Sequence, residues 1–237
     1  MTMLPGTKRI IAIDILRGIV MVVMALDHVR DFFSGFAYDP TDLQHAGTAM
    51  FLTRWVTHYC APVFIFLSGT SAWLAARSSS TKDTSLRLLT RGLWLVVLEV
   101  TVVRFGWMFN LQYSLVILQV IWAIGISMVV LAGLVWLPRW AILAIALLMI
   151  GGHNALDGYH GSGWLWQLLH VQGPINYGYG RMLMVIYPLV PWVGVMAAGY
   201  CLGSVMAMEE RQRNRILYTI GLGAIALFIV LRAINGY

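Results

Sequence analysis

The segment 11–33 is a long apolar run interrupted by six ionisable side chains. Five of them are candidates for one polar stripe, Asp14, Arg17, Asp27, His28 and Asp31, whereas Arg30 points away from it. A helix turns about 100° per residue, so Arg17 and His28 lie within about 20° of one another on its surface. Asp14 and Asp31 fall within about 60° on either side of that line. Imidazole suits proton transfer near neutral pH, especially beside a carboxylate that fixes its tautomer. The pattern predicts a polar stripe with His28 as a general base tuned by Asp27 or Asp31.

Other ionisable residues fall inside apolar stretches further along the chain. Arg54 and His58 are four residues apart and therefore share a helix face. Glu99 lies near the middle of another apolar run. A charge near the centre of a membrane helix costs about 2.5–3.5 kcal/mol, so these groups should face a protein or water-filled interior. For Glu99 we expect a structural ion pair with an intramembrane arginine, whereas His58 is equally compatible with a hydrogen-bonded core residue.

The composition explains why these charges are unusual. Apolar residues make up 59% of the 237 residues, charged residues only 11%, and the mean hydropathy is +0.77. A soluble domain carries about 25% charged residues, which excludes a freely soluble enzyme and indicates an integral membrane protein in the lipid bilayer. Only two cysteines occur, so a disulfide scaffold is also excluded.

Runs of about 20 apolar residues are long enough to cross a bilayer as helices. The chain contains seven such runs, at about 11–33, 50–76, 86–108, 114–137, 139–155, 182–207 and 215–234. We therefore predict an all-α, polytopic helix bundle that forms a single domain over residues 1–237.

The basic residues predict the orientation of this bundle. Ten of the sixteen lysines and arginines lie before the first run or near every second connection: Lys8, Arg9, Arg77, Lys82, Arg87, Arg91, Arg139, Arg211, Arg213 and Arg215. Cytoplasmic loops of membrane proteins are enriched in Lys and Arg. The expected protein has a cytoplasmic N-terminus and lies in the inner cell membrane, and its net charge of +6 needs no nucleic-acid partner.

Two features have both a packing and a functional interpretation. The connection 156–181 is rich in glycine and aromatic residues, and its segment WLWQLLH could anchor at the membrane interface or contact a substrate. The small residues at 68–71 and the motif GYCLG at 199–203 favour close helix packing. Such faces serve contacts within and between chains, so a homo-oligomer stays open.

Several kinds of catalytic site have no matching motif. The sequence lacks HExxH, the histidines are scattered, and no cysteine pair is present, so we expect no metal. A P-loop, a nucleophile elbow and a Rossmann fingerprint are also missing from the sequence.

The segment RIIAIDILRGIVMVVMALDHVRDFF resembles a bacterial membrane family related to the catalytic domain of heparan-alpha-glucosaminide N-acetyltransferase. The resemblance continues through FLTRWVTHYCAPVFIFLSG and YPLVPWVGVMAAGYCLG and covers nearly the whole chain. The IDxLRG start also resembles a broader superfamily of membrane acyltransferases, in which the Arg and His matching Arg17 and His28 are implicated in using an acyl-CoA donor. His45 lies in a loop comparable to one that supplies a histidine in the eukaryotic enzyme, but its surroundings match poorly and that role is not transferred.

The resemblance implies an acyltransferase with acetyl-CoA as co-substrate and an extracytoplasmic sugar or related acceptor. His28, Asp27 and Asp31 are then the catalytic candidates, with Arg17 and Asp14 on the donor. Arg54 and His58 would orient the acceptor or stabilise the oxyanion. Members of the family usually continue for several spans after the segment resembling LRAINGY, so the chain looks C-terminally shortened. A proton-coupled transporter and a non-catalytic membrane subunit are the alternatives.

Overall fold

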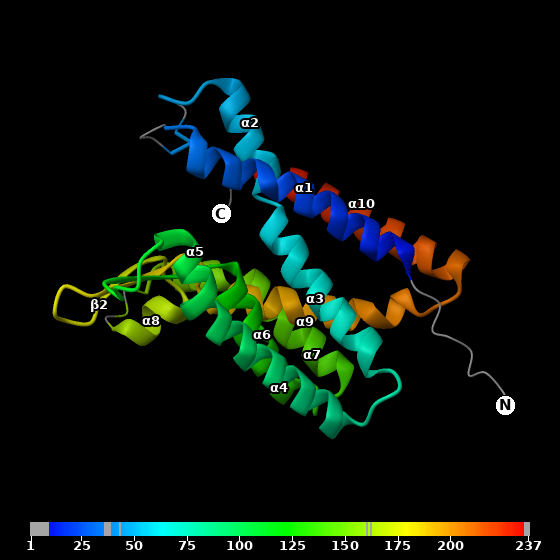
Figure 1. Cartoon of the computed structure of the whole chain (residues 1–237). Helices are drawn as coiled ribbons and strands as arrows, with labels where there is room; N and C mark the ends of the chain where they lie inside the picture. Colours follow the sequence, from blue (N-terminus) through cyan, green and yellow to red (C-terminus); the bar gives the residue numbers. More distant parts are fainter. Residues whose placement is uncertain (1–9, 36–38, 43, 160, 162, 235–237) are drawn as a thin grey trace. The chain divides into compact units, whose positions relative to one another are not determined.

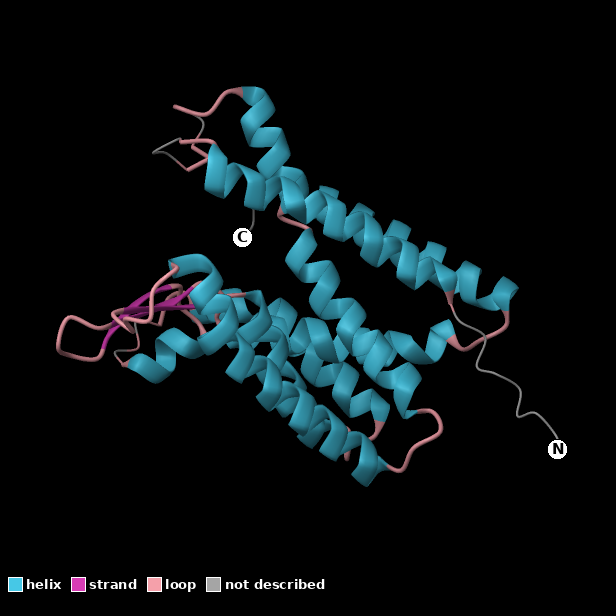
Figure 2. Cartoon of the chain, in the orientation of Figure 1, coloured by secondary structure: helices cyan, strands magenta, loops and turns pink. Residues whose placement is uncertain are grey.

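The computed structural model describes residues 10–35, 39–42, 44–159, 161 and 163–234. The chain is mostly helical, with one small sheet (Figures 1 and 2). It divides into two compact units, Met1–Leu67 and Ser68–Tyr237.

The first unit is built on helix α1, Ile11–Phe33, whose ends agree with the predicted run. It packs against α2, Thr48–Thr57. After a break at 58–59, α3 begins and spans Cys60–Ala76, so its later part belongs to the second unit. Pro62 lies in the first turn of α3 and has no N–H to bond the carbonyl of His58. The break therefore falls where the sequence cannot continue the hydrogen-bond ladder of α2.

The second unit continues with one long, locally irregular helical segment. Helix α4, Thr81–Leu98, begins at Ser80, whose Oγ accepts a hydrogen bond of 3.1 Å from the backbone N–H of Asp83. This N-cap supplies a partner to an end N–H group that has none within the helix. A π-helical turn, η1, follows at Glu99–Val103, and then α5 at Arg104–Met108. Together they confirm the helix expected over 86–108 and extend it at its N-terminal end.

Four further helices complete the helical part of this unit: α6 Val120–Leu134, α7 Arg139–Gly152, α9 Leu189–Met206 and α10 Glu210–Ile234. Helix α6 packs against both α4 and α9, and α7 packs against α9. No residue of α10 that the structure describes is buried within the chain.

Glycines set the closest helix contacts, as the small-residue patterns predicted. A Cβ atom at Gly92 of α4 would lie 2.5 Å from the carbonyl oxygen of Gly125 on α6. At Gly203 of α9 it would lie 2.5 Å from the Cβ of Trp73 on α3. The motif at 199–203 also accepts a hydrogen bond of 3.0 Å, from the Thr70 hydroxyl to the Gly199 carbonyl. The helices approach to distances that only glycine allows.

A three-stranded sheet was not predicted. Strand β1, Leu115–Leu118, pairs in parallel with β3, Met182–Val185, which pairs antiparallel with β2, Gly173–Asn176. The predicted helices at 114–137 and 182–207 therefore begin too early, because their first residues form strands. A small hydrophobic core lies at this sheet and is formed by three strand residues, Val116 and Leu118 of β1 and Val185 of β3. The fold is mostly helical rather than all-α.

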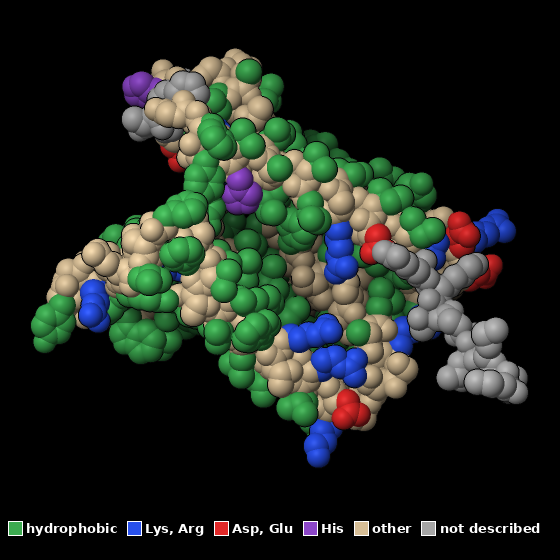
Figure 3. All heavy atoms as spheres, in the orientation of Figure 1, with side chains coloured by type: hydrophobic (Ala, Val, Ile, Leu, Met, Phe, Trp, Pro, Cys, Tyr) green, Lys and Arg blue, Asp and Glu red, His purple; other side chains and the backbone are tan. Residues whose placement is uncertain are grey.

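Four helical segments are long and apolar enough to cross a membrane, judged by length and composition. They are Thr48–Ala76, Arg139–Leu156, Leu189–Met206 and Glu210–Ile234. Val120–Leu134 is apolar but shorter. Hydrophobic side chains also cover much of the visible surface (Figure 3). A lipid environment accounts for this exposed apolar surface, which water would not favour.

Candidate functional site

The polar residues of α1 lie on its less exposed face. Asp14, Arg17, Asp27 and His28 are all partly buried. The fully buried positions Ile13 and Val20 recur at the same helical spacing. Asp31 is exposed. The stripe deduced from helix geometry is thus a protein-facing surface over most of its length.

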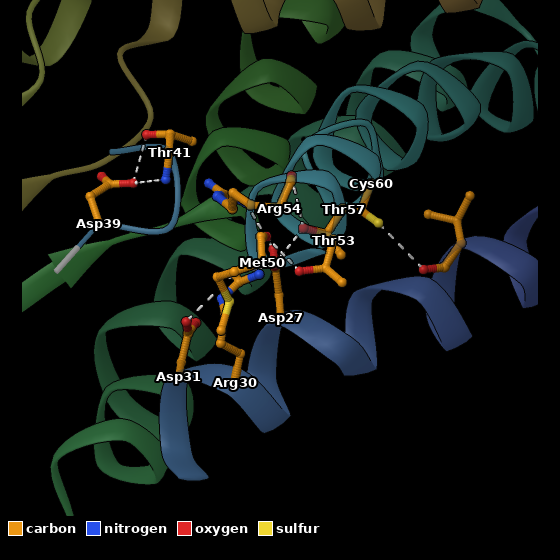
Figure 4. A network of polar contacts seen from close by, with 11 residues as sticks. Asp27, Arg30, Asp31, Asp39, Thr41, Met50, Thr53, Arg54, Thr57 and Cys60 are labelled. Atoms are coloured by element: carbon orange, nitrogen blue, oxygen red, sulfur yellow. Dashed lines mark hydrogen bonds and ion pairs between the residues drawn. The ribbon is translucent and has the colours of Figure 1, made fainter. Parts of the chain in front are cut away.

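Asp27 is the centre of a polar network between α1 and α2 (Figure 4). Its Oδ2 accepts a hydrogen bond of 2.9 Å from Nη1 of Arg54. Its Oδ1 accepts a bond of 2.5 Å from the Thr57 hydroxyl, and Arg30 also donates to Oδ1. The Asp27 side chain is 18% exposed. Two guanidinium groups and a hydroxyl therefore hold one partly buried carboxylate.

This arrangement gives Asp27 a different set of partners from the one expected. The sequence suggested a carboxylate orienting His28, whereas the observed bonds of Asp27 go to arginines and a threonine. Asp31 lies 3.8 Å from Arg30 at the edge of the network. Asp27 is thus placed to orient the guanidinium of Arg54.

Arg30 and Thr57 are network members that sequence reasoning missed. Arg30 follows Asp27 by three residues, a spacing that places two helical side chains together. Thr57 is fully buried on α2 and also donates to the carbonyl of Arg54 at 3.1 Å. The first could have been found from spacing, but the second depends on how α2 packs on α1.

The remaining candidates of the first unit are distributed along it. Arg17 donates to the carbonyl oxygen of Leu67 at 3.4 Å, and Asp14 is one helical turn before it. His58 is exposed at the end of α2, and its backbone N–H bonds the carbonyl of Arg54 at 3.0 Å. Arg54 enters the Asp27 network, but within the described residues the network does not include the side chain of His58.

An imidazole–carboxylate pair occurs in the loop between α1 and α2. Nδ1 of His45 lies 2.6 Å from Oδ2 of Asp42. This bond, together with the backbone N–H of Gln44, holds the pKa of Asp42 below its ordinary value. The pair has the geometry that we expected of His28 with Asp27 or Asp31, and it belongs to an exposed loop.

Glu99 is buried in the second unit, with an exposed fraction of 1%. Its two carboxylate oxygens accept bonds from the backbone N–H groups of Gln119 and Trp122, at 3.1 and 3.2 Å. Both donors lie at the start of α6, where N–H groups lack helical partners and the helix dipole favours an anion. The observed partners of Glu99 are backbone amides at a helix end, where the sequence suggested an arginine.

Arg104 is a buried arginine of the second unit that we did not single out. It donates to the carbonyl oxygens of Asn110, Gln112 and Leu115, and to Oδ1 of Asn110 at 2.9 Å. Its guanidinium also lies 4.5 Å from the ring centre of Tyr113. These contacts fix the turn between α5 and β1, which indicates a structural role.

Within the described part of the chain, no group of three His, Cys, Asp or Glu side chains is arranged to hold a metal ion. Cys60 and Cys201 are both free thiols.

Comparison with known protein families gives one result. The family model of the heparan-alpha-glucosaminide N-acetyltransferase catalytic domain matches residues 9–232. The chain belongs to this family. The match includes both units and every candidate residue named above. Searches of curated proteins and of solved structures find no match.

Membership indicates a membrane protein of the acetyltransferase type. Transferases of the heparan-alpha-glucosaminide N-acetyltransferase type use acetyl groups derived from acetyl-CoA. The apolar helices agree with a membrane location.

Proposed function

We propose that this protein is a membrane acyltransferase that moves an acetyl group from acetyl-CoA to an extracytoplasmic sugar or related small molecule. The observation that carries the proposal is the family match over residues 9–232. The partly buried polar face of α1 adds support. Ionisable groups in an apolar membrane segment cost free energy, and where they occur they usually serve a function.

The reaction needs a base, a donor site and a site for the developing oxyanion. His28 takes a proton from the acceptor amine or hydroxyl, which attacks the thioester carbonyl carbon. As the tetrahedral intermediate collapses, the new C–N or C–O bond remains and the C–S bond breaks. The proton held by the imidazole then passes to the departing thiolate. Asp31 lies one turn after His28 on the same helix.

Arginines supply the electrostatic part of this scheme. Arg17 and Asp14 bind the acetyl-CoA donor in this scheme, because a guanidinium suits phosphate or pantetheine oxygens. Arg54 gives one N–H to Asp27 and has four others, so a pre-positioned donor remains for the acceptor or the oxyanion. His58 is placed beside the acceptor. Asp27 acts as a positioning residue for Arg54.

His45 is the alternative general base. Its bond to Asp42 fixes the orientation of the imidazole, as a carboxylate neighbour does in proton-transfer sites. Separate substitutions of His28 and His45 distinguish the two candidates for the general base.

The membrane arrangement is part of the same proposal. Seven spans with the N-terminus in the cytoplasm of an inner-membrane protein agree with the positions of the basic residues. Single cysteines introduced at Lys82 and at Thr41, in a background lacking Cys60 and Cys201, test the orientation with an impermeant thiol reagent. The first should react only from the cytoplasmic side and the second only from outside. Reversed labelling would contradict the proposal.

The activity itself is tested with the full chain in nanodiscs. Labelled acetyl-CoA is supplied with a panel of neutral and amino monosaccharides, and acetylated sugar and free CoA thiol are measured together. We expect the two products in equal amounts. If no sugar of the panel were acetylated, although a thermal unfolding transition showed that the protein was folded, the proposed transfer would be contradicted.

A further inference from the structure

A pocket of about 840 Å³ lies within the second unit, in the connection between α7 and α9. One wall comes from Asp157 and Tyr159, in the loop that follows the 3-10 turn η2, His153–Leu156. Another comes from the short helix α8, Trp164–Leu169, and the lining continues into β2. The segment WLWQLLH of this connection thus contributes to a concave site. None of the residues proposed for acetyl transfer lines it.

Aromatic rings form a large part of the wall. Tyr159 meets Trp166 edge to face, with ring centres 5.0 Å apart, and Trp166 lies 4.9 Å from the ring of His170. Trp164 also lines the pocket and is 63% exposed. Ligand sites in proteins combine such rings with a few fixed polar groups.

The fixed polar groups are side chains of several kinds. Nε2 of His170 lies 2.9 Å from Oδ1 of Asp157, and the His170 side chain is 5% exposed. Gln167 and Gln172 are held by single bonds from their amide nitrogens to the carbonyls of Pro174 and Ile186. Their side-chain oxygens are acceptors in known positions.

Two buried polar atoms of the wall have no hydrogen-bond partner within the described residues. They are Nδ1 of His170 and Nε1 of Trp166. A buried polar group without a partner costs free energy, so such groups are rare in folded proteins. Almost none of the surface of these two atoms is accessible, so a ligand in the pocket contacts the rings of Trp166 and His170 and not these nitrogens.

The charges of the lining residues restrict the chemical class of ligand that the pocket can bind. Asp157 is the acidic residue of the lining, and no Lys or Arg of the described chain lines it. Anionic ligands such as nucleotides and sulfated sugars need cationic partners. A pyranose has an apolar ring face for an indole and hydroxyl groups for amides and carboxylates.

We propose that this pocket is a saccharide-binding site that takes a pyranose unit without phosphate or sulfate groups. The assignment stands on the geometry of the second unit alone. Interface anchoring would explain the exposed Trp164, but it does not require the His170–Asp157 pair or the positioned amides.

The test measures binding rather than turnover. The full chain in nanodiscs is titrated with cellotriose, with the trisaccharide of glucosamine and with a sulfated heparin trisaccharide, using saturation-transfer NMR and calorimetry. We expect dissociation constants of about 1 mM for one or both of the first two. The sulfated sugar should bind at least tenfold more weakly. The two unsulfated arms distinguish a neutral sugar from an amino sugar.

Matched tryptophan variants locate the site. Trp164→Ala should weaken binding about three- to tenfold, because an aromatic contact of this size is lost. Trp136→Ala is the control, since Trp136 is 62% exposed and does not line the pocket. Asp157→Asn should also weaken binding, with thermal unfolding unchanged. Equal affinities of the two tryptophan variants, tighter binding of the sulfated sugar, or no binding by any unsulfated trisaccharide would overturn the proposal.

Discussion

The two units keep their helices together by different means. In the first, α1 and α2 are joined by charged and hydroxyl groups around Asp27. In the second, glycines allow close approach of α4 to α6, and of α9 to α3 and α7. Charge pairs hold helices in one register but leave polar atoms available, whereas glycine contacts leave no room for a ligand. The polar face of the first unit therefore keeps groups that a reaction could use, and this is where we propose the acetyl transfer, whereas the helix contacts of the second unit favour rigidity.

The largest expected effect concerns proton transfer in the first unit. His28→Ala should lower acetyl transfer by about 10²–10⁴-fold, the usual loss when a general base is removed. Turnover in nanodiscs and thermal unfolding are measured together, and the unfolding temperature should stay close to that of the parent. Val29→Ala, at the exposed neighbouring position, is the matched control.

His45→Ala separates the two histidines. If turnover falls with this variant and not with His28→Ala, the base belongs to the loop pair with Asp42 rather than to the α1 stripe. A His28→Ala protein that is destabilised but fully active per folded molecule would also contradict the catalytic assignment of His28.

The next effect compares two carboxylates, the partly buried one of Asp27 and the buried one of Glu99. Asp27→Asn removes a charge facing two guanidinium groups, and we expect a loss of about 2–4 kcal/mol in the free energy of unfolding. The carboxylate of Glu99 accepts bonds from two backbone N–H groups, and a glutamine at this position keeps one acceptor oxygen. We therefore expect Glu99→Gln to lower the free energy of unfolding by about 1 kcal/mol. Thermal unfolding in one detergent gives both values. An equal or reversed order would mean that the arginines of the first unit do not depend on Asp27.

Part of this comparison could be predicted from the sequence. The limits of α1 and its polar face follow from hydrophobic periodicity, since Asp14, Arg17, Asp27 and His28 share one side of a regular helix. Arg54 was expected to be functional. Its pairing with Asp27 could not be predicted, because 27 residues separate the two and only the packing of α2 brings them together.

The sheet shows where periodicity fails. The sequences LVIL at 115–118 and MLMV at 182–185 are continuous apolar runs, which can be strands or parts of buried helices. Their parallel pairing joins segments more than 60 residues apart, and no local signal records it. The π-helical turn at Glu99–Val103 has no sequence signal either, and Glu99, its first residue, bonds the distant backbone N–H of Gln119.

A smaller effect tests the glycine contacts of the second unit. A Cβ atom at Gly69 of α3 would lie 2.0 Å from the carbonyl oxygen of Met196 on α9, so backbone must move to admit it. Gly69→Ala should therefore cost about 1–3 kcal/mol of the free energy of unfolding. Gly18→Ala on α1 is the control, because nothing lies within 4 Å of its added methyl group. That control should be neutral or slightly stabilising. Equal losses for the two variants would mean that close packing does not distinguish the units.

The smallest effect concerns the loop that joins the two helices of the first unit. Oδ1 of Asp39 accepts bonds from the backbone N–H and the hydroxyl of Thr41, at 2.8 and 2.7 Å. These bonds hold the pKa of Asp39 below its ordinary value. Because the folded pKa is the lower one, the stabilisation is complete at neutral pH. It declines as the pH falls below the unfolded value and is lost below the folded one.

Acidification through this range should therefore loosen the turn that Asp39 and Thr41 form. We expect the hydrogen-exchange protection of the Thr41 amide, corrected for the intrinsic rate, to fall about twofold, since exposed charge interactions are weak. Thr41→Val removes the hydroxyl bond, which is the larger cause of the lowered pKa, and should shift the loss of protection to higher pH. The Thr90 hydroxyl bonds only carbonyls within α4, so Thr90→Val is the matched control and should leave the Thr41 profile unchanged. A protection profile that is the same for the parent and Thr41→Val would show that Asp39 does not order this loop.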